Sequence, residues 1–320
     1  MKIVVLDGFA VNPGDLNWDF LDKYGEAVIY DHTPPALSAS RCADAEAVFT
    51  NRAVINENLL EKCGKIKFIG ALGTGYDMID LDACKKRGIE VCNVPGYSSV
   101  SVSQFTITLL LHLITDISGF TQIVKSGMWT GVPGFHYEKT RYTELAGRTL
   151  GLIGCGAIGK KVANIAQAFG MRVVATTKNR YSGSENCVDY MRLDELLYTS
   201  DCISLHCPLN DETKEMVNSG FISKMKDGAF IINTARGAIL NEGDVAKALN
   251  SGKLGGAALD VLAIEPPKAD NPLLTARNCI ITPHAAWTSI EARKRLLDVT
   301  EANLDSFLKT GRSINSLIKI

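Results

Sequence analysis

The 320-residue sequence lacks any apolar run of the length needed to cross a bilayer, and its N-terminal apolar run, Ile3 to Leu6, ends at Asp7. We therefore expect a cytoplasmic protein with no membrane partner. An excess of charge of one sign is also missing, because 34 basic residues face 35 acidic ones and leave a net charge of −1. Nucleic acids attract basic surfaces, so we expect no nucleic-acid partner.

Metal-binding and disulfide patterns are equally scarce. The nine cysteines are scattered without a Cys-x-x-Cys pair, and only five histidines are present. An odd, scattered set argues against a secreted disulfide framework, so most of these cysteines are expected to be small buried apolar residues. We expect no metal site. Cys207 beside a predicted strand end could contact a ligand, but only His206 lies near it in sequence, which disfavours a catalytic thiol.

The sequence does contain short apolar runs that alternate with helical stretches, which is typical of parallel sheets covered by helices. The first array occupies about residues 1–97, and a second begins near residue 150. Strands are expected at residues 3–6, 27–30, 47–50, 67–71 and 89–92, with helices near 16–23, 56–63 and 80–87, and then strands at 150–153, 171–176, 202–205, 229–232, 255–259 and 279–281.

A long helix from about Ser98 to Lys125 is predicted between the two arrays, and its apolar surface is too wide for a helix with one solvated face. It could join domains or pair with a second subunit. A last helix, Thr288 to Leu308, is expected to pack back on the first array. The predicted fold is α/β, with two doubly wound parallel-sheet domains and a cleft between them. Residues 1–98 and 287–320 are expected to form one domain, and residues 99–286 the other.

A glycine turn, GCGAIG at residues 154–159, lies between a predicted strand and a predicted helix. In a dinucleotide-binding turn Gly154 would permit the tight bend and Gly156 the approach of a pyrophosphate, while Gly159 would let the helix pack on the strand. The alternative is a turn without a ligand, since 28 glycines produce such spacings by chance. The strand before it and the helix after it favour the cofactor turn.

Polar residues follow the later predicted strands. Arg236 emerges after one strand, where open α/β sheets bind ligands, and its planar guanidinium suits a carboxylate. Asp260 follows the next strand, Glu265 lies five residues further, and His284 follows the last one. Taken singly, each has an ordinary explanation as a surface cation, a loop carboxylate or a hydrogen-bonded histidine.

Together, these motifs resemble the D-2-hydroxyacid dehydrogenase family over essentially the whole chain, and most of all its glycerate dehydrogenase (hydroxypyruvate reductase) branch. The similarity lies in GCGAIG at 154–159, NTARG at 233–237, LDVLAIEPP at 259–267 and TPHAAW at 282–287, and, for the branch, in LDGFAVNPGDLNWD at 6–19, TGYDMID at 74–80, NVPGYSSVSVSQFT at 93–106 and Trp287.

The resemblance implies an oxidoreductase with a flavodoxin-like substrate domain and a Rossmann cofactor domain. It would transfer hydride between NAD(P)H and a small 2-keto acid, with hydroxypyruvate favoured over glyoxylate. It would also form a homodimer through the helix near residues 98–125. The alternatives are another member of the family, such as phosphoglycerate dehydrogenase, and a non-enzymatic nicotinamide-sensing protein; a methyltransferase is a weaker rival, since it has no use for these polar residues.

Residue chemistry agrees with that implication. Arg236 would fix the carboxylate and polarise the carbonyl, His284 as imidazolium would give the proton, and Glu265 would favour the charged imidazolium. Backbone amides in the loop Leu72, Gly73, Thr74 and Gly75 are expected to hold the carboxylate from the other side, the alternative being a turn without a ligand. The expected cofactor contacts are Gly154, Gly156, Ala157, Ile158, Gly159, Thr177, Lys178, Arg180, His206, Cys207, Pro208, Thr234, Ala235, Asp260 and Ala286.

The choice between cofactors depends on the end of the second strand of the cofactor domain. An NAD-selective domain usually has an acidic residue there, about 20 residues after the glycines, which accepts from the ribose 2′-hydroxyl. Here Thr177 takes that position, Lys178 and Arg180 follow, and no carboxylate appears before Glu185. This set favours NADP(H) over NAD(H), because cations suit a 2′-phosphate. The alternative is a solvated basic loop in a protein that uses NAD(H).

Overall fold

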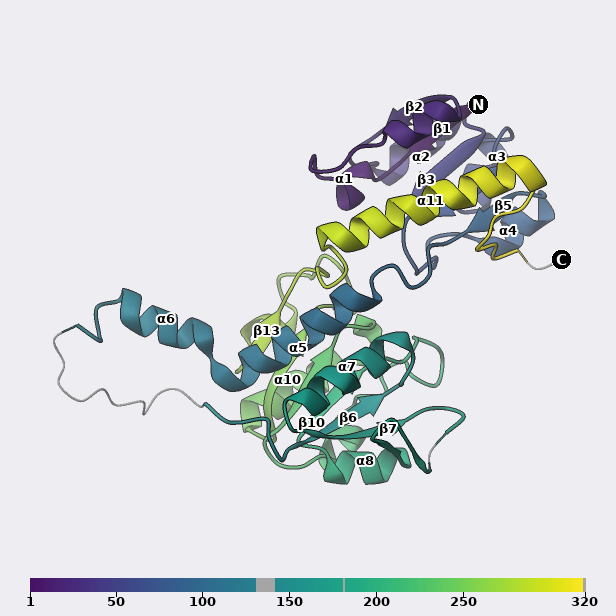
Figure 1. Cartoon of the computed structure of the whole chain (residues 1–320). Coiled ribbons are helices and arrows are strands. Elements are labelled where there is room, and N and C mark those ends of the chain that lie inside the picture. The colour runs from purple at the N-terminus through teal and green to yellow at the C-terminus, as the bar shows by residue number, and fades with distance from the viewer. Residues whose placement is uncertain (131–141, 181, 319–320) are drawn as a thin grey trace. The chain divides into compact units, whose positions relative to one another are not determined.

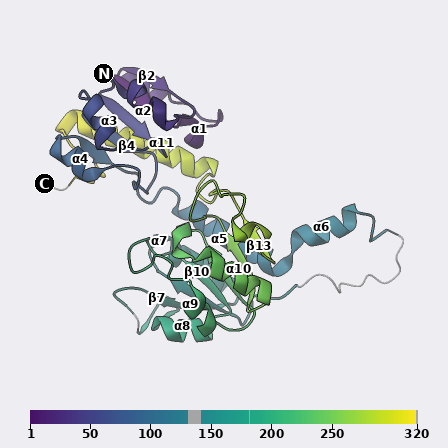
Figure 2. The ribbon, with the colours of Figure 1, turned by 180° about the vertical axis from the view of Figure 1, so that it is seen from behind.

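The computed structural model describes residues 1–130, 142–180 and 182–318, and the chain divides into two compact units (Figures 1 and 2). The first unit contains Met1–Ser98 and Thr288–Ile320, and the second contains Ser99–Trp287. Trp287, which the sequence pattern assigned to the first domain, groups with the second unit. Each unit has its own sheet and its own apolar core.

The first unit is built on a five-stranded parallel sheet with the order β2-β1-β3-β4-β5. This is the flavodoxin-like order, in which the chain reverses direction across the sheet between β1 and β3. The strands are β1 (Lys2–Val5), β2 (Glu26–Ile29), β3 (Ala47–Thr50), β4 (Phe68–Ala71) and β5 (Glu90–Cys92), which confirms the five predicted strands to within a residue at either end.

Helices cover both faces of this sheet because its central strands are apolar on both sides. One face carries Val48 and Ile69 and packs against α2, α3 and α4, while Phe68 on the other face stacks at 5.1 Å on Phe307 of α11. The stretch expected to be helical near 16–23 is only a short 3-10 helix, and α2, which begins with a proline, was not predicted. The helices are α1 (Gly8–Val11), η1 (Asp19–Lys23), α2 (Pro35–Cys42), α3 (Glu57–Lys62), α4 (Leu81–Lys86) and α11 (Ile290–Thr310).

The second unit has an eight-stranded sheet with the order β13-β12-β11-β10-β6-β7-β9-β8. All neighbours are parallel except β8 and β9, a short pair that the sequence pattern did not predict. The strands are β6 (Thr149–Ile153), β7 (Arg172–Thr176), β8 (Ser184–Glu185), β9 (Val188–Tyr190), β10 (Cys202–Leu205), β11 (Ala229–Asn233), β12 (Leu254–Leu259) and β13 (Cys279–Ile281). The helical elements that follow β6 are α7 (Ala157–Ala168), α8 (Leu193–Thr199), α9 (Ser219–Lys224), η2 (Gly237–Ile239), α10 (Glu242–Ser251) and η3 (Pro272–Thr275).

The long helix predicted from Ser98 to Lys125 is in fact two helices, α5 (Ser99–Thr115) and α6 (Ile117–Lys125), which meet at an angle of 56°. Asp116 separates them, because it has a left-handed backbone with φ of 47° and its carboxylate caps α6 by accepting from the Gly119 N–H at 3.1 Å. Helix α5 packs into the core beside α7. Helix α6 buries no side chain, and it projects from the body of the second unit (Figure 1).

Among the described residues, no single helix combines the length and the apolar composition of a membrane span. Within the part of the chain that the structure describes, only α5 and α6 taken together reach those values, and they do so as a bent pair.

Candidate active site

The glycine turn between β6 and α7 contains three glycines with three different surroundings. Gly154 has a left-handed φ of 91°, and a Cβ there would lie 2.5 Å from the carbonyl oxygen of His206. A Cβ on Gly159 would lie 2.7 Å from the carbonyl oxygen of Gly154. A Cβ on Gly156 would meet nothing within 4 Å, so packing within the protein does not require that glycine.

The space beside Gly156 opens at the N-terminus of α7, whose cap makes no side-chain hydrogen bond. Helix N-termini with unpaired N–H groups attract phosphates. In the sheet, the strand order reverses between β6 and β10, and the glycine turn follows β6 at this point. Open α/β sheets bind their ligands at such reversals. These residues fit the pyrophosphate of a dinucleotide.

His284 and Glu265 lie side by side, with 2.7 Å between Nδ1 of the imidazole and Oε2 of the carboxylate. The other carboxylate oxygen of Glu265 accepts from the Leu262 N–H at 3.1 Å, which fixes the loop that carries it. His284 has a left-handed φ of 54°, and its N–H donates to the carbonyl oxygen of Asp260 at 2.8 Å. The fold therefore brings together the carboxylate and the imidazole that the sequence pattern paired.

Asp260 holds the turn on which His284 lies. Its carboxylate is 1% exposed and accepts from the Thr282 hydroxyl at 2.6 Å and from the N–H groups of Ala285 and Ala286 at 2.8 and 2.9 Å. Burial raises the pKa of Asp260 above its ordinary value, and these donors oppose that rise. Asp260 and Ala286 were both expected to contact the cofactor. In the structure, both carboxylate oxygens of Asp260 and the N–H of Ala286 form hydrogen bonds within the protein.

Arg236 follows β11 and is positioned by Asn233, a fully buried residue whose role the sequence interpretation missed. The amide of Asn233 accepts from the Ala235 N–H at 3.0 Å and donates to the Arg236 carbonyl oxygen at 2.9 Å. The guanidinium Nη1 donates to the Ala235 carbonyl oxygen at 2.9 Å. An asparagine at a strand end is a known turn former, so the signal was available in the NTARG motif.

Gly237 connects the Arg236 turn to the Glu265 loop. A Cβ at this position would lie 1.9 Å from the carbonyl carbon of Leu262, so only glycine allows the two segments to touch. Leu262 in turn binds Glu265, which binds His284. Since β11, β12 and β13 are neighbours in register, Arg236, Glu265 and His284 follow adjacent strands at one edge of the sheet.

His206, Cys207 and Pro208 follow β10 next to the glycine turn. The ring Nε2 of His206 lies 2.9 Å from the Ser204 hydroxyl, and burial lowers the pKa of His206 to about 4. Burial also raises the pKa of the Cys207 thiol, which disfavours a thiolate there. Thr234 lies on the neighbouring strand end, with its hydroxyl 2.9 Å from that of Thr106 on α5.

The loop after β7 differs from the expectation of cations open to a phosphate. The Lys178 ammonium lies 3.1 Å from both carboxylate oxygens of Glu212, and Arg180 forms an ion pair with Glu185. The Arg180 guanidinium also stacks on the Tyr190 ring at 4.1 Å. Glu212 is distant from Lys178 in sequence, and Glu185 lies in β8, which was not predicted. The sequence pattern therefore revealed neither of these ion pairs.

The Leu72–Gly75 loop follows β4 in the first unit, whereas the other predicted site residues belong to the second. Leu72 is buried and its N–H donates to the Thr50 carbonyl oxygen at 2.7 Å, which extends the pairing of β4 with β3.

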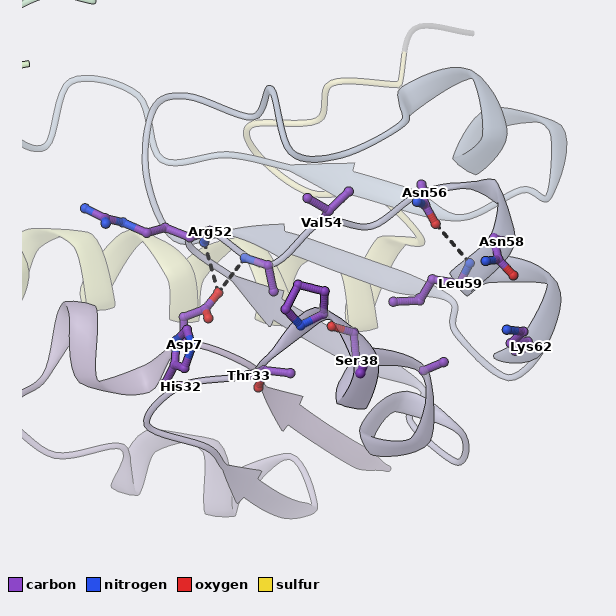
Figure 3. A pocket seen from close by; sticks show the side chains of 14 residues that line it. Asp7, His32, Thr33, Ser38, Arg52, Val54, Asn56, Asn58, Leu59 and Lys62 are labelled. Atoms are coloured by element: carbon purple, nitrogen blue, oxygen red, sulfur yellow. Dashed lines mark hydrogen bonds between the residues drawn. The ribbon is translucent and has the colours of Figure 1, made fainter. Parts of the chain in front are cut away.

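A pocket of about 430 Å³ lies elsewhere in the first unit, at the carboxyl ends of β1 and β3 (Figure 3). Asp7, His32, Ser38, Arg52 and Leu59 are among its lining residues, and no predicted site residue lines it. In the part of the chain that the structure describes, no group of three or more histidine, cysteine or acidic side chains could hold a metal ion.

Comparison with known proteins gives consistent results. Residues 107–286 match the family described as D-isomer specific 2-hydroxyacid dehydrogenase, NAD binding domain. The chain is 47% identical to the hydroxypyruvate reductase of Blautia hydrogenotrophica, with 100% of both chains covered, which confirms the resemblance seen in the motifs.

Two solved structures are similar over nearly the whole chain. The D-lactate dehydrogenase from Aquifex aeolicus, complexed with NAD and lactic acid, has a TM-score of 0.83 and 30% identity, with 98% of this chain and 99% of that chain covered. An acyclic imino acid reductase in complex with NADPH and D-Arg has a TM-score of 0.86 and 29% identity, with 99% and 100% covered. Similar structures are thus described with either nicotinamide cofactor.

Proposed function

Because the chain belongs to the D-isomer specific 2-hydroxyacid dehydrogenase family, we propose that it reduces hydroxypyruvate to D-glycerate, with glyoxylate as a second substrate. The observation that carries the proposal is the His284–Glu265 pair at 2.7 Å, at the same sheet edge as Arg236. A protein that only senses a nicotinamide needs no proton donor held by a carboxylate. In this proposal the first unit is the substrate-binding domain and the second is the dinucleotide-binding domain.

We assign each residue a separate role in the reaction. In the second unit, Arg236 binds the substrate carboxylate and polarises the carbonyl. In the first unit, the amides of the Leu72–Gly75 loop are the other proposed carboxylate-binding group. Glu265 occupies Nδ1 of His284, which leaves Nε2 of the imidazolium to give its proton to the carbonyl oxygen. A nicotinamide cofactor held at the Gly154–Gly159 turn supplies the hydride when it is bound.

The proposed cofactor preference is for NADP(H). It is supported by Thr177 in the place of the usual acidic residue and by Lys178 and Arg180 after it. Because Arg180 is already paired with Glu185, a 2′-phosphate would have to displace that carboxylate, so we expect a modest preference. Glu185→Gln should increase the ratio of kcat/KM with NADPH to that with NADH, whereas Arg180→Ala should decrease it. A clear preference of the wild-type protein for NADH would refute the proposal.

The proposed partner is a second copy of the chain, bound through α6. This helix contains no buried residue, and its apolar residues Ile117 and Val124 are 59% and 48% exposed. Apolar side chains gathered on a projecting helix are typical of an interface.

The test of the activity follows the absorbance of NADPH and NADH with hydroxypyruvate, glyoxylate and 3-phosphohydroxypyruvate. We expect the highest kcat/KM with hydroxypyruvate and poor turnover of the phosphorylated acid. Efficient turnover of 3-phosphohydroxypyruvate would instead indicate a phosphoglycerate dehydrogenase. Cofactor binding without oxidation by any 2-keto acid would favour the nicotinamide-sensing protein.

A further inference from the structure

The Leu72–Gly75 loop is attached to the first unit by its carbonyl oxygens. The Leu72 oxygen accepts from the Asn51 side-chain amide at 2.6 Å, and the Thr74 oxygen accepts from the Asn93 side-chain amide at 2.7 Å. Between them, the Gly73 oxygen accepts from the Val94 N–H at 2.9 Å. Three consecutive carbonyl groups are therefore held, the Leu72 oxygen by the segment that follows β3 and the next two by the segment that follows β5 on the other side of β4.

This attachment determines where the N–H groups point. In a planar trans peptide the carbonyl of one residue and the N–H of the next point in opposite directions. Holding the oxygens of Leu72, Gly73 and Thr74 thus fixes the planes of three successive peptides and, with them, the directions of the N–H groups of Gly73, Thr74 and Gly75. Within residues 1–130, 142–180 and 182–318, these three N–H groups donate to no protein acceptor. Three adjacent unpaired N–H groups suit a carboxylate.

Asn51 is itself fixed by a buried carboxylate. One oxygen of Asp7, which is 4% exposed, accepts from the N–H groups of Asn51, Arg52 and Ala53 at 3.3, 2.9 and 2.8 Å and from the Thr50 hydroxyl at 3.1 Å. Figure 3 shows Asp7 directed at this turn. The turn after β3, which includes the backbone of Asn51, therefore has little conformational freedom.

Asn93 is fixed by the C-terminal segment. The amide of Asn303, on α11 and 1% exposed, donates to the Asn93 carbonyl oxygen at 2.9 Å. The Asn303 oxygen accepts from the backbone and side-chain N–H groups of Asn315 at 3.1 and 3.0 Å. A chain of asparagines thus runs from the last helix to the Thr74 carbonyl.

We propose that Asn51 and Asn93 are positioning residues for the substrate carboxylate, and that Asn303 supports Asn93 from the C-terminal segment. They fix the peptide planes of the Leu72–Gly75 loop before the substrate binds, so that binding of the anion to its N–H groups requires little reorganisation of the loop. This inference rests on the proposed reduction of a 2-keto acid.

The test compares Asn51→Ala, Asn93→Ala and Asn303→Asp with the wild-type enzyme. Binding of the carboxylate is shared by the ground state and the transition state, so its loss raises KM and leaves kcat nearly unchanged. We expect KM for hydroxypyruvate to rise about tenfold in Asn51→Ala and Asn93→Ala and less in Asn303→Asp, with cofactor affinity unchanged. Asn51→Ala removes the hydrogen bond from the Asn51 side chain to the Leu72 carbonyl oxygen, and it covers the case in which Asn93→Ala or Asn303→Asp does not fold.

Asn56→Ala is the matched control. The Asn56 side chain caps α3 in the same unit by accepting from the Leu59 N–H at 3.1 Å, and it does not bind the loop. Its loss should lower stability without raising KM. Unchanged KM in all three test variants, or an equal rise in the control, would overturn the inference. A wild-type chain without turnover would refute the proposed function instead, and calorimetric titration with D-glycerate would then test the loop separately.

Discussion

His284 has a left-handed backbone, which histidine adopts more readily than most residues but which still requires support from its surroundings. The support comes from Asp260, whose carbonyl and carboxylate bind the turn from residue 282 to 286. Because the backbone contacts of this turn do not depend on the imidazole, His284→Ala should fold and bind cofactor normally. We expect its turnover to fall by about two to four orders of magnitude. Steady-state kinetics and cofactor titration check this, and near-normal turnover would rule out His284 as the proton donor.

Glu265 should act through the charge of its neighbour. Glu265→Gln keeps a side chain of similar shape but removes the negative charge 2.7 Å from Nδ1 of His284. The His284 ring then loses its charged hydrogen-bond partner, so kcat for hydroxypyruvate reduction should fall by about tenfold or more while cofactor affinity stays nearly unchanged. Steady-state kinetics and cofactor titration measure the two effects. An unchanged kcat would show that Glu265 is not the partner of the catalytic imidazole.

His206 should make stability depend on pH. Its folded-state pKa, about 4, lies below the ordinary 6.5, so the unfolded chain binds the proton more readily. The stabilisation from the neutral ring is complete above pH 6.5 and is lost as the pH falls toward 4, by on the order of 1–3 kcal/mol. Urea unfolding of wild type and His206→Gln across this window should show their difference in unfolding free energy shrinking at low pH. A difference independent of pH would contradict the assignment.

At the scale of the element, the β6–turn–α7 segment separates glycines required by the fold from the glycine open to a ligand. Gly159→Ala places a methyl group 2.7 Å from the Gly154 oxygen and should lower the unfolding free energy by about 1–3 kcal/mol. Gly156→Ala meets open space and has an ordinary φ of −80°, so its stability should change by less than about 0.5 kcal/mol. Its cofactor affinity should nevertheless fall at least about tenfold, because the methyl group takes the place of the pyrophosphate. Thermal unfolding and cofactor titration measure the two effects, and equal cofactor affinity in Gly156→Ala would exclude this turn as the phosphate site.

Elements with strong periodic patterns were predictable, and features that depend on long-range contacts were not. The strands follow from runs of buried aliphatic residues, and the glycine turn follows from its spacing between a strand and a helix. The break at Asp116 was missed because the apolar pattern continues across it, although the Asp116-x-x-Gly119 cap was visible in the sequence. The pairing of Arg180 with Glu185 depends on the short β8–β9 hairpin, and the contact of Asn51 with Leu72 depends on β3 lying beside β4.

At the scale of the whole molecule, the first unit is closed by the end of the chain. Arg293 on α11 is 7% exposed and binds both carboxylate oxygens of Asp15 at 2.6 Å and the Val11 carbonyl oxygen at 3.1 Å. Hydrogen bonds from Arg293 hold the pKa of Asp15 below its ordinary value. Together with the hydrogen bond from Asn303 to Asn93, these contacts make the last segment part of the core of the first unit. They also connect that segment to the loop proposed to bind substrate.

Two apolar residues of α6 in the second unit, Ile117 and Val124, are exposed, and the dimer proposal follows from that exposure. Ile117→Asp and Val124→Asp each place a charge on the exposed apolar side of α6, where a partner helix would have to bury it at a cost of several kcal/mol. Sedimentation should therefore show a dimer for the wild-type protein and a shift toward monomer for both variants, with thermal stability of the monomeric fold nearly unchanged. Tyr198→Asp is the control, because Tyr198 is 63% exposed on α8 of the same unit. A dimer that survives both α6 substitutions but not Tyr198→Asp would move the interface to α8, and a monomeric wild-type protein would refute the dimer altogether.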